Sequence, residues 1–347
     1  MVDSGTMRGV FYLGPGNLEL REVPIPSPQA GELLVKVNMA LTCGTDLKTY
    51  RRGHPKFPPP FLLGHEFAGN VVAMGTGVEQ FKPGMRVTAN VFAPCMECYY
   101  CLHGQDNLCE HLHYNFGAFA EYMILPRSIV QLNTFHIPDH LPDAHAAMLE
   151  PLVSVVHGQR RIAIQPGDTV AIVGAGGAIS LLHLQISLLS GASRVIGVGH
   201  SDTRLQIFSQ MGGSEVINTH QASAVDQVLE MTGGRGADVV IECAGSSEAW
   251  ESAVQMVRKG GRVLWFGGLP KGTILQIDPG RIHYGELSLL GVHGGTLSDA
   301  QEAYRLLVSG EIDPSLLISG TCPLDKIEEA FQQMIDGSAI KMAIIPG

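Results

Sequence analysis

The sequence predicts an α/β protein of two domains, one a barrel-like β-domain and the other a doubly wound parallel sheet. Three observations predict this fold class. At 347 residues, the chain is longer than one hydrophobic core usually organises. Short strand patterns between Gly and Pro turns dominate its first part, whereas strand and helix patterns alternate after Pro166-Gly167-Asp168. A Gly-rich turn joins the first strand of this second part to a helix.

The first domain is expected over residues 1–152. Its alternating apolar residues and dense turns predict mostly antiparallel strands, among them Leu33–Val37, Ala68–Ala73 and Met85–Ala89. From about Ser298 a further helix and a short strand remain. We therefore expect residues 293–347 to return to this first domain.

The second domain is expected over residues 153–292. Its runs of branched apolar residues are typical of strands buried on both faces of a parallel sheet. These runs are Thr169–Val173, Arg194–Val198, Ala237–Ile241 and Arg262–Phe266. Apolar residues recur at helical spacing over Ile179–Leu189, between the first two runs. Strands that alternate with helices in this way predict a doubly wound sheet.

Composition argues against a membrane-spanning protein and against a nucleic-acid partner. The chain is 45% hydrophobic and 16% charged, and it has no uninterrupted apolar run of the roughly 18 residues that a membrane helix needs. We therefore expect no membrane span. Its net charge of −10 is spread along the chain, and Lys and Arg form no stripe, so we expect no nucleic-acid partner.

Four cysteines follow one another in the segment 94–110, as Cys95, Cys98, Cys101 and Cys109. The two-residue gaps allow one loop to present three thiolates to a single ion while the fourth returns from nearby, which is typical of a closed structural zinc site. Two disulfides or an iron–sulfur cluster are the alternatives. A closed site leaves no position for substrate, so this lobe is expected to stabilise the fold.

The other three cysteines, Cys43, Cys243 and Cys322, are scattered along the chain. No apolar segment with basic flanks, as in a signal peptide, opens the sequence. Both features favour a reducing cytoplasm, in which disulfides are rare.

A second metal site is indicated by Cys43 and by Gly64-His65-Glu66. A cysteine, a histidine and a carboxylate around an open fourth position are the ligands of a catalytic zinc, because the open position takes water or a substrate oxygen. Taken singly, His65 is more often a hydrogen-bonded turn residue. Its combination with a four-cysteine lobe and a doubly wound sheet favours the metal site.

The Gly-rich turn after the strand Thr169–Val173 contains Gly174, Gly176 and Gly177. Between a buried strand and a helix, such glycines allow a tight turn and a close approach of the backbone to a pyrophosphate at the helix N-terminus. The third glycine of the usual fingerprint is replaced by Ile179. We expect dinucleotide binding here, and we assign Gly245 to the same site.

The next strand ends at Gly199, where an enzyme that uses NAD usually has a carboxylate for the ribose. Without that carboxylate a 2′-phosphate meets no repulsion, and Ser201 and Arg204 could bind it. We assign Gly199, His200, Ser201 and Arg204 to the cofactor site and expect NADP rather than NAD. The alternative is that Arg204 is solvated and Asp202 accepts the ribose hydroxyl.

Several motifs together resemble the zinc-dependent medium-chain dehydrogenase/reductase family, which is alcohol dehydrogenase-like, and within it the polyol and threonine dehydrogenases. They occur in the family's order over almost the whole chain: Cys43-Gly44-Thr45-Asp46, Gly64-His65-Glu66, the four-cysteine lobe, Gly117-Ala118-Phe119-Ala120-Glu121-Tyr122, Glu150-Pro151-Leu152 and Gly174-Ala175-Gly176. The resemblance implies a GroES-like β-barrel catalytic domain and a Rossmann nucleotide-binding domain.

The resemblance also implies two zinc ions per chain, the catalytic one on Cys43 and His65 with Glu66 or Glu150. The zinc would stabilise an alkoxide while hydride passes to the nicotinamide. We expect catalytic roles for Thr45, Lys48 and Glu66. The Thr45 hydroxyl is the expected first proton acceptor. Lys48 replaces a histidine that continues the proton relay in many members, and it could face the cofactor instead.

The expected function is hydride transfer between a polar secondary alcohol, such as a polyol, cyclitol or amino alcohol, or its ketone, and NAD(P). Sorbitol itself is not favoured, because Gly291-Val292-His293 stands where sorbitol-type enzymes carry an Arg-Tyr pair. His293 either lines the substrate site or is structural. The alternatives are a zinc-independent reductase of double bonds and a redox sensor without turnover.

We also expect a homodimer or homotetramer. The apolar segment Leu287-Ser288-Leu289-Leu290 resembles a strand at the edge of a sheet, available for pairing across a two-fold axis. An ordinary internal strand is the alternative.

Overall fold

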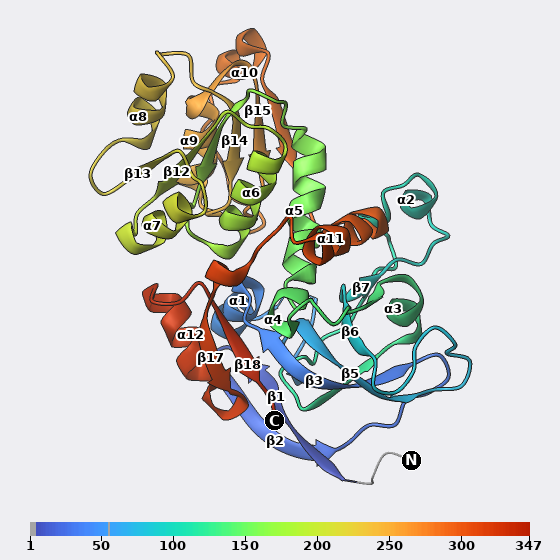
Figure 1. Ribbon diagram of the computed structural model, residues 1–347. Helices are drawn as coiled ribbons and strands as arrows, with labels where there is room; N and C mark the ends of the chain where they lie inside the picture. The colour runs from blue at the N-terminus through green and yellow to red at the C-terminus, as the bar shows by residue number, and fades with distance from the viewer. Residues whose placement is uncertain (1–4, 55) are drawn as a thin grey trace. The chain divides into compact units, whose positions relative to one another are not determined.

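The computed structural model describes residues 5–54 and 56–347, and it divides into two compact units (Figure 1). Unit 1 comprises Met1–Val153 and Thr296–Gly347, and unit 2 comprises Ser154–Gly295. Unit 1 is therefore discontinuous in sequence, because unit 2 is inserted between its two segments.

Unit 1 is built around a seven-stranded sheet in the order β10-β6-β5-β3-β18-β17, with β9 also paired to β3. Smaller sheets, in the orders β2-β1-β4 and β7-β8, complete it. The strands are β1 (Thr6–Gly14), β2 (Asn17–Pro24), β3 (Leu33–Leu41), β4 (Phe61–Leu62), β5 (Glu66–Met74), β6 (Arg86–Ala89), β7 (Phe92–Ala93), β8 (His113–Tyr114), β9 (Tyr122–Leu125), β10 (Thr134–His136), β17 (Ile318–Pro323) and β18 (Lys341–Ile345).

The pairing of β3 in the middle of this sheet positions the candidate site. β3 is antiparallel to β5, with Leu41 opposite Glu66. β18 is antiparallel to the same end of β3, with Ala343 opposite Leu41. The chain segments that follow Leu41, precede Glu66 and begin at Lys341 are therefore brought together at one edge.

The core of unit 1 contains the fully buried rings of Phe67, Phe119 and Phe331, together with inward-facing residues of β3, β5 and β9. Its helices range from 4 to 13 residues. They are α1 (Gly44–Arg52), α2 (Tyr99–Leu102), α3 (Arg127–Leu132), α4 (Asp143–Ala146), α11 (Leu297–Ser309) and α12 (Ile327–Asp336), with 3₁₀ turns at Asp106–Leu108, Ser315–Leu317 and Leu324–Lys326. Helix α5 (Leu149–Ile162) contains the boundary between the units.

Unit 2 contains a six-stranded parallel sheet in the order β13-β12-β11-β14-β15-β16. The strands are β11 (Thr169–Val173), β12 (Arg194–Gly199), β13 (Glu215–Asn218), β14 (Ala237–Glu242), β15 (Val257–Trp265) and β16 (Ser288–Gly291). Strand order reverses between β11 and β14, which makes that point the switch point of a doubly wound sheet. The predicted α/β fold class, with a β-rich domain and a parallel sheet, is confirmed.

The helices of unit 2 cover both faces of its sheet. α6 (Ala178–Leu189) packs on β11 and β12, and α7 (Asp202–Gln210) on β12 and β13. α9 (Ser247–Met256) packs on β14, and α8 (Ala224–Met231) packs against α9 and β13 (Figure 1). Right-handed crossovers that lead away from the switch point in opposite directions place α6 and α9 on opposite faces. α10 (Pro279–Gly285) precedes the edge strand.

One predicted strand has a different start. We expected Arg262–Phe266, but β15 begins five residues earlier, at Val257, and ends at Trp265. Gly260 and Gly261 hid its first half, because glycines in a strand pattern read as a turn. A register shift opposite Ala237 and Val239 accommodates them.

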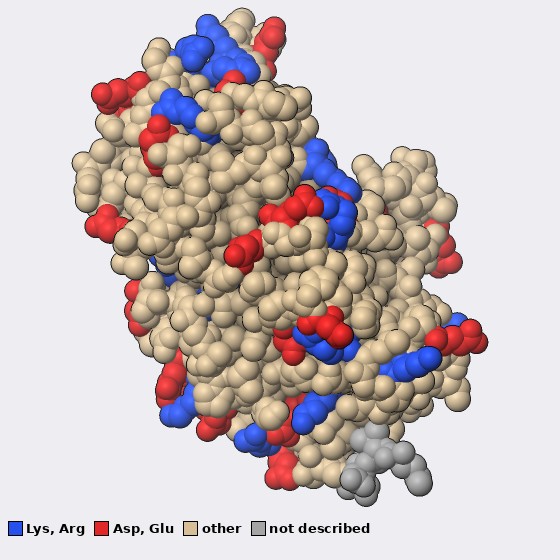
Figure 2. All heavy atoms as spheres, in the orientation of Figure 1, with Lys and Arg blue, Asp and Glu red and all other residues tan. Residues whose placement is uncertain are grey.

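None of the helices in the described ranges is both long and apolar enough to cross a bilayer. On the face shown in Figure 2, basic and acidic side chains of the described residues are interspersed. Ion pairs among the described residues include that between Arg258 and Asp238 and that between Arg86 and Asp143.

Candidate metal centres and dinucleotide site

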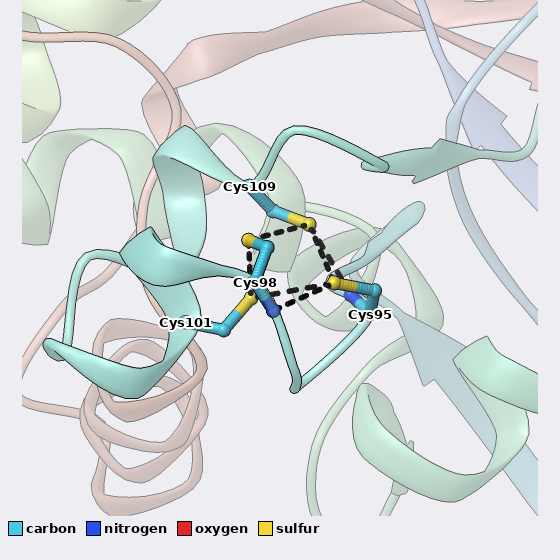
Figure 3. A group of neighbouring side chains, drawn as sticks. All are labelled: Cys95, Cys98, Cys101 and Cys109. Atoms are coloured by element: carbon cyan, nitrogen blue, oxygen red, sulfur yellow. Dashed lines mark hydrogen bonds between the residues drawn. The ribbon is translucent and has the colours of Figure 1, made fainter.

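The four cysteines predicted to share a metal converge on one point in unit 1 (Figure 3). Sγ–Sγ distances are 3.9 Å for Cys95 and Cys101, 3.5 Å for Cys98 and Cys101, 3.8 Å for Cys98 and Cys109, and 3.5 Å for Cys95 and Cys109. A tetrahedron with zinc–sulfur bonds of about 2.3 Å has edges of about 3.8 Å. All four thiols are free, so the disulfide alternative has no support in the geometry.

Backbone N–H groups surround these sulfur atoms. Cys95 and His111 donate to Cys109 Sγ, both at 3.3 Å, and Cys98 donates to Cys95 Sγ at 3.4 Å. Such donors favour the thiolate form, and those from Cys101 and Glu110 lower the pKa of Cys98 to about 6. Burial has the opposite effect on two other members of the lobe, because it raises the pKa of Cys101 to about 12 and also raises that of Cys109.

A second convergence brings together Cys43, His65 and Glu66, whose potential ligand atoms lie within 4.8 Å of one another. Cys43 is the N-cap of α1, two residues after the end of β3, and the pair His65-Glu66 stands at the start of β5. Because Leu41 pairs with Glu66, the register of β3 and β5 alone brings the two segments together.

Asp46 fixes the orientation of two of these residues. One carboxylate oxygen accepts the Cys43 backbone N–H at 3.1 Å, and the other lies 3.0 Å from His65 Nδ1. A carboxylate on Nδ1 sets the tautomer that leaves Nε2 available as a ligand. Asp46 is in the capping position three residues after Cys43, so local helix chemistry places it.

Glu66 is buried, and its two carboxylate oxygens have different surroundings. Its Oε2 accepts a hydrogen bond from Lys341 Nζ at 2.5 Å, and Lys341 also donates to Thr42 O at 2.8 Å. Its Oε1 is buried and has no hydrogen-bond partner among the described residues. A buried carboxylate oxygen without a partner is costly unless something absent from the protein chain binds it.

The electrostatics of this group favour a cation. Burial raises the pKa of Glu66 to about 7 even though Lys341 and His65 lower it, and burial also raises the pKa values of Cys43 and Glu150. Burial would lower the pKa of His65, but Asp46 and Cys43 raise it well above its usual value. A divalent cation would stabilise the ionised forms of these buried acids and so offset the cost of burying their charges. The donor set and the unpartnered Oε1 therefore fit zinc.

The other residues assigned to the catalytic site lie around this group. Glu150, in the first turn of α5, is outside the group within 4.8 Å, although its charge raises the pKa of Glu66. Thr45 and Lys48 are one helical turn apart on α1, and both are exposed. They can thus lead from the group of Cys43 towards solvent.

The Gly-rich turn in unit 2 has the geometry that a pyrophosphate requires. Gly174 and Gly176 have positive φ angles of 85° and 90°, and Gly177 is the N-cap of α6. A Cβ on Gly176 would lie 2.4 Å from that of Arg204, and one on Gly174 would lie 2.9 Å from Ala244 N. Neither glycine can be replaced without moving backbone. Ile179 lies in the first turn of α6, where the usual third glycine is absent.

The segment after β12 bears on the choice between NAD and NADP. Gly199 is the last residue of β12, and a Cβ there would approach Ala175 O to 2.9 Å, so an acidic side chain is sterically opposed as well as absent. Asp202 accepts a hydrogen bond from Asn218 Nδ2 at 2.6 Å. Ser201 is the N-cap of α7 but makes no capping hydrogen bond through its side chain. His200 lies beside His220, with 5.7 Å between the ring centroids.

Two remaining residues lie at the carboxyl edge of the unit 2 sheet. Gly245 follows β14 with a φ of 68°, and His293 is exposed after β16.

Sequence reasoning missed the roles of Asp46 and Lys341. A single lysine in the apolar segment Ile340–Ile345 was the available signal, because a charge inside such a strand requires a buried partner.

Comparisons with known proteins match both units. Residues 29–138 match the family described as Alcohol dehydrogenase GroES-like domain, and residues 178–309 match Zinc-binding dehydrogenase. Sorbitol dehydrogenase from Halalkalibacterium halodurans is 32% identical, over 96% of this chain and 97% of the relative. L-threonine 3-dehydrogenase from Pyrococcus horikoshii is 33% identical, over 99% of each.

A solved structure supports the same relationship. A putative zinc-binding dehydrogenase from Sinorhizobium meliloti, bound to NADP, superposes with a TM-score of 0.91 at 34% identity, over 99% of this chain and 100% of that one. The chain therefore belongs to the zinc-type medium-chain dehydrogenase family and is an NAD(P)-dependent alcohol dehydrogenase.

Proposed function

We propose that this dehydrogenase transfers hydride between a polar secondary alcohol, such as a polyol, cyclitol or amino alcohol, and NADP, with two zinc ions per chain. The observation that carries the proposal is the convergence of Cys43, His65 and Glu66 beside an unpartnered, buried Glu66 Oε1. We assign one zinc to these residues, with Glu150 as an exchanging ligand. We assign the other zinc to Cys95, Cys98, Cys101 and Cys109.

When bound, the zinc of the first group supplies a Lewis acid that lowers the pKa of an alcohol hydroxyl. The protein's own residues then have separate tasks. Asp46 holds the His65 ring through Nδ1, and Lys341 holds one oxygen of Glu66. The exposed Thr45 hydroxyl accepts the proton that the alcohol loses and passes it to solvent past Lys48. A nicotinamide dinucleotide held at the turn of Gly174 and Gly176 would supply the hydride acceptor for oxidation and, in its reduced form, the hydride donor for reduction.

Metal analysis combined with a substrate screen tests the assignment. The purified protein should contain about two zinc ions per chain and oxidise secondary alcohols with NADP or NAD. His65→Ala should lose one zinc and the activity, whereas His136→Ala, which changes an exposed histidine of β10, should lose neither. Retained activity in His65→Ala would overturn the catalytic assignment. Reduction of activated double bonds by zinc-free protein would support the alternative reductase.

The preference for NADP is supported by the segment after β12. Gly199 leaves the 2′ position without a carboxylate, and Asp202 is held by Asn218. Ser201 and Arg204, at the N-terminus of α7, are the proposed phosphate ligands. The similar protein from Sinorhizobium meliloti was solved with NADP.

Kinetics with both cofactors test this preference. Arg204→Ala should lower kcat/KM for NADP by about ten-fold to a hundred-fold, the effect of one charge-assisted contact, and should change that for NAD little. Arg161→Ala, an exposed arginine on α5, is the matched control. An unmodified enzyme that prefers NAD by ten-fold or more would contradict the proposal.

We propose a homodimer or homotetramer that pairs through β16. The support is its position at the edge of the unit 2 sheet, where Leu289 and Leu290 are partly exposed, together with the exposed Ile274 and Tyr284 nearby in sequence. Sedimentation that shows only monomer at micromolar concentration would contradict this.

A reducing cytoplasm is the proposed location, supported by seven free cysteines in the described residues.

A further inference from the structure

Glu242, the last residue of β14, is a fully buried carboxylate that the catalytic scheme does not use. It lies in unit 2 beside the switch point, opposite Val173 of β11 on one side and Trp265 of β15 on the other. Its Oε1 accepts the Gly245 backbone N–H at 2.7 Å. Its backbone oxygen accepts the N–H groups of Phe266 at 2.9 Å and Gly267 at 3.0 Å. One residue therefore joins the loops that follow β14 and β15.

These two loops are in direct backbone contact, and a third loop joins them. A Cβ on Gly267 would lie 2.5 Å from Gly245 N and 2.8 Å from Glu242 Oε2. A Cβ on Gly174, in the Gly-rich turn, would lie 2.9 Å from Ala244 N. The loops that follow the neighbouring strands β11, β14 and β15 thus meet backbone to backbone at the carboxyl edge of the sheet, through glycines at Gly174, Gly245 and Gly267. In doubly wound sheets this edge, at the switch point, is where the ligand binds.

Burial of the Glu242 carboxylate carries a desolvation penalty that destabilises its ionised form. It raises the pKa of Glu242, although the N–H groups of Gly245, Ala244 and Gly267 lower it, and Oε2 has no hydrogen-bond partner among the described residues. An apolar residue at the end of β14 would avoid that cost but could not hold Gly245. The carboxylate is explained if the spacing of the two loops matters for what binds above them.

We propose that Glu242 is a positioning residue that sets the spacing of the Gly245 and Gly267 loops, which form the part of the cofactor site shared by NAD and NADP. The inference rests on the proposed function, because it assumes that a nicotinamide dinucleotide occupies this edge. Ser201 and Arg204 would discriminate between the two cofactors, whereas Glu242 would act equally on both.

A pair of tryptophans beside the Gly267 loop provides an intrinsic fluorescence probe of this part of the sheet edge. The chain's only two tryptophans, Trp250 and Trp265, are stacked with 4.5 Å between ring centroids and 6° between planes. Trp250 Nε1 donates to Gly267 O at 2.8 Å, and Trp265 Nε1 donates to Trp250 O at 3.2 Å. Tryptophan fluorescence and near-UV circular dichroism therefore report on the Gly267 loop and on cofactor binding without any turnover.

The test is the dissociation constant of NADP and of NAD, measured by tryptophan fluorescence in the absence of alcohol. E242A should weaken both cofactors by the same factor, about ten-fold or more, because a contact to a charged group is lost. E242Q keeps an acceptor for Gly245 N–H and should restore both to within about two-fold of the unmodified protein. Zinc content should not change in either variant.

Asp238 provides the matched control at the other end of β14. Its Oδ2 accepts the Thr169 backbone N–H at 2.8 Å, so D238A also removes a carboxylate from a backbone donor, but at the amino edge of the sheet. It should lower stability and leave both dissociation constants unchanged. If E242A does not fold, E242D replaces it, since a side chain one methylene shorter cannot reach Gly245 without moving the loop.

The results distinguish a failure of the proposed role of Glu242 from a failure of the proposed function. Binding of both cofactors within two-fold of normal in E242A or E242D would overturn the role of Glu242, as would a loss for only one cofactor or equal weakening in D238A. If the unmodified protein binds neither cofactor, the proposed function itself fails.

Discussion

Replacement of Lys341 by methionine should damage one metal centre and leave the other intact. The lysine and Glu66 form an ion pair with 2.5 Å between Nζ and Oε2, and their side chains are 3% and 0% exposed. Removing one partner of such a buried pair costs about 3–5 kcal/mol of unfolding free energy, because Glu66 must then either remain a buried charge without its partner or take up a proton. Methionine fills a similar volume, so most of the loss should be electrostatic.

The same change should reduce metal binding. Glu66 has a pKa of about 7 with Lys341 present, and Lys341 lowers it. Without the lysine this pKa rises further, so Glu66 is a neutral acid at pH 7 and a poor ligand. Lys341→Met should therefore contain about one zinc per chain at pH 7, held by the four-cysteine lobe, and should recover zinc as the pH is raised.

The assay is chemical denaturation of the zinc-free protein together with elemental analysis. Lys326→Met is the matched control, because Lys326 pairs with Glu329 at the same 2.5 Å but with side chains 52% and 62% exposed. It should cost less than about 1 kcal/mol. The double variant Lys341→Met/Glu66→Gln should regain stability but not zinc. A cost below about 1 kcal/mol for Lys341→Met, with two zinc ions retained, would refute the reasoning.

Three other changes test separate parts of the molecule. Cys98→Ser should leave one zinc and lower the unfolding temperature, whereas Cys322→Ser, outside the lobe, should keep two; equal zinc contents would count against the lobe. Thr45→Val should lower kcat by about a hundred-fold or more while Thr45→Ser retains it, and an unchanged kcat in the valine variant would remove Thr45 from the proton path. Burial lowers the pKa of His183 to about 3, so the unfolded chain binds a proton that the folded chain excludes. Stability should therefore fall as the pH drops from about 6.5 towards 3, by about 1.4 kcal/mol per unit, and His183→Gln should flatten the slope unless another group causes it.

The fold was accessible from sequence because local patterns and global architecture agree. The strands Thr169–Val173 and Arg194–Gly199 are buried on both faces, so their apolar runs predict a parallel sheet directly. The tight turn at Gly174 and Gly176 was recognisable from sequence, because only glycine fits its positive φ angles and close backbone contacts. The start of β15 was missed because its glycines accommodate a register shift that only the neighbouring strand explains.

The candidate metal site was accessible in part. Cys43, His65 and Glu66 are recognisable by residue type, and the antiparallel register of β3 and β5 brings them together. Lys341 is distant in sequence, and only the pairing of β18 with β3 places it beside Glu66. Glu242 was hidden for another reason: a carboxylate at the end of an apolar strand gives no sign of which loop amides it will meet.

The contact of Lys341 with Glu66 also bears on how the chain folds. The two residues are 275 positions apart, and closing a loop of that length costs about 5 kcal/mol of chain entropy before the contact forms. During synthesis, unit 2 is complete at Gly295, while unit 1 still lacks β17 and β18. A nascent chain that ends between Gly295 and β18 would therefore have all the strands of the parallel sheet but a Glu66 without its lysine partner. The candidate ligands Cys43, His65 and Glu66 would thus all be present before the lysine that holds Glu66 has been made.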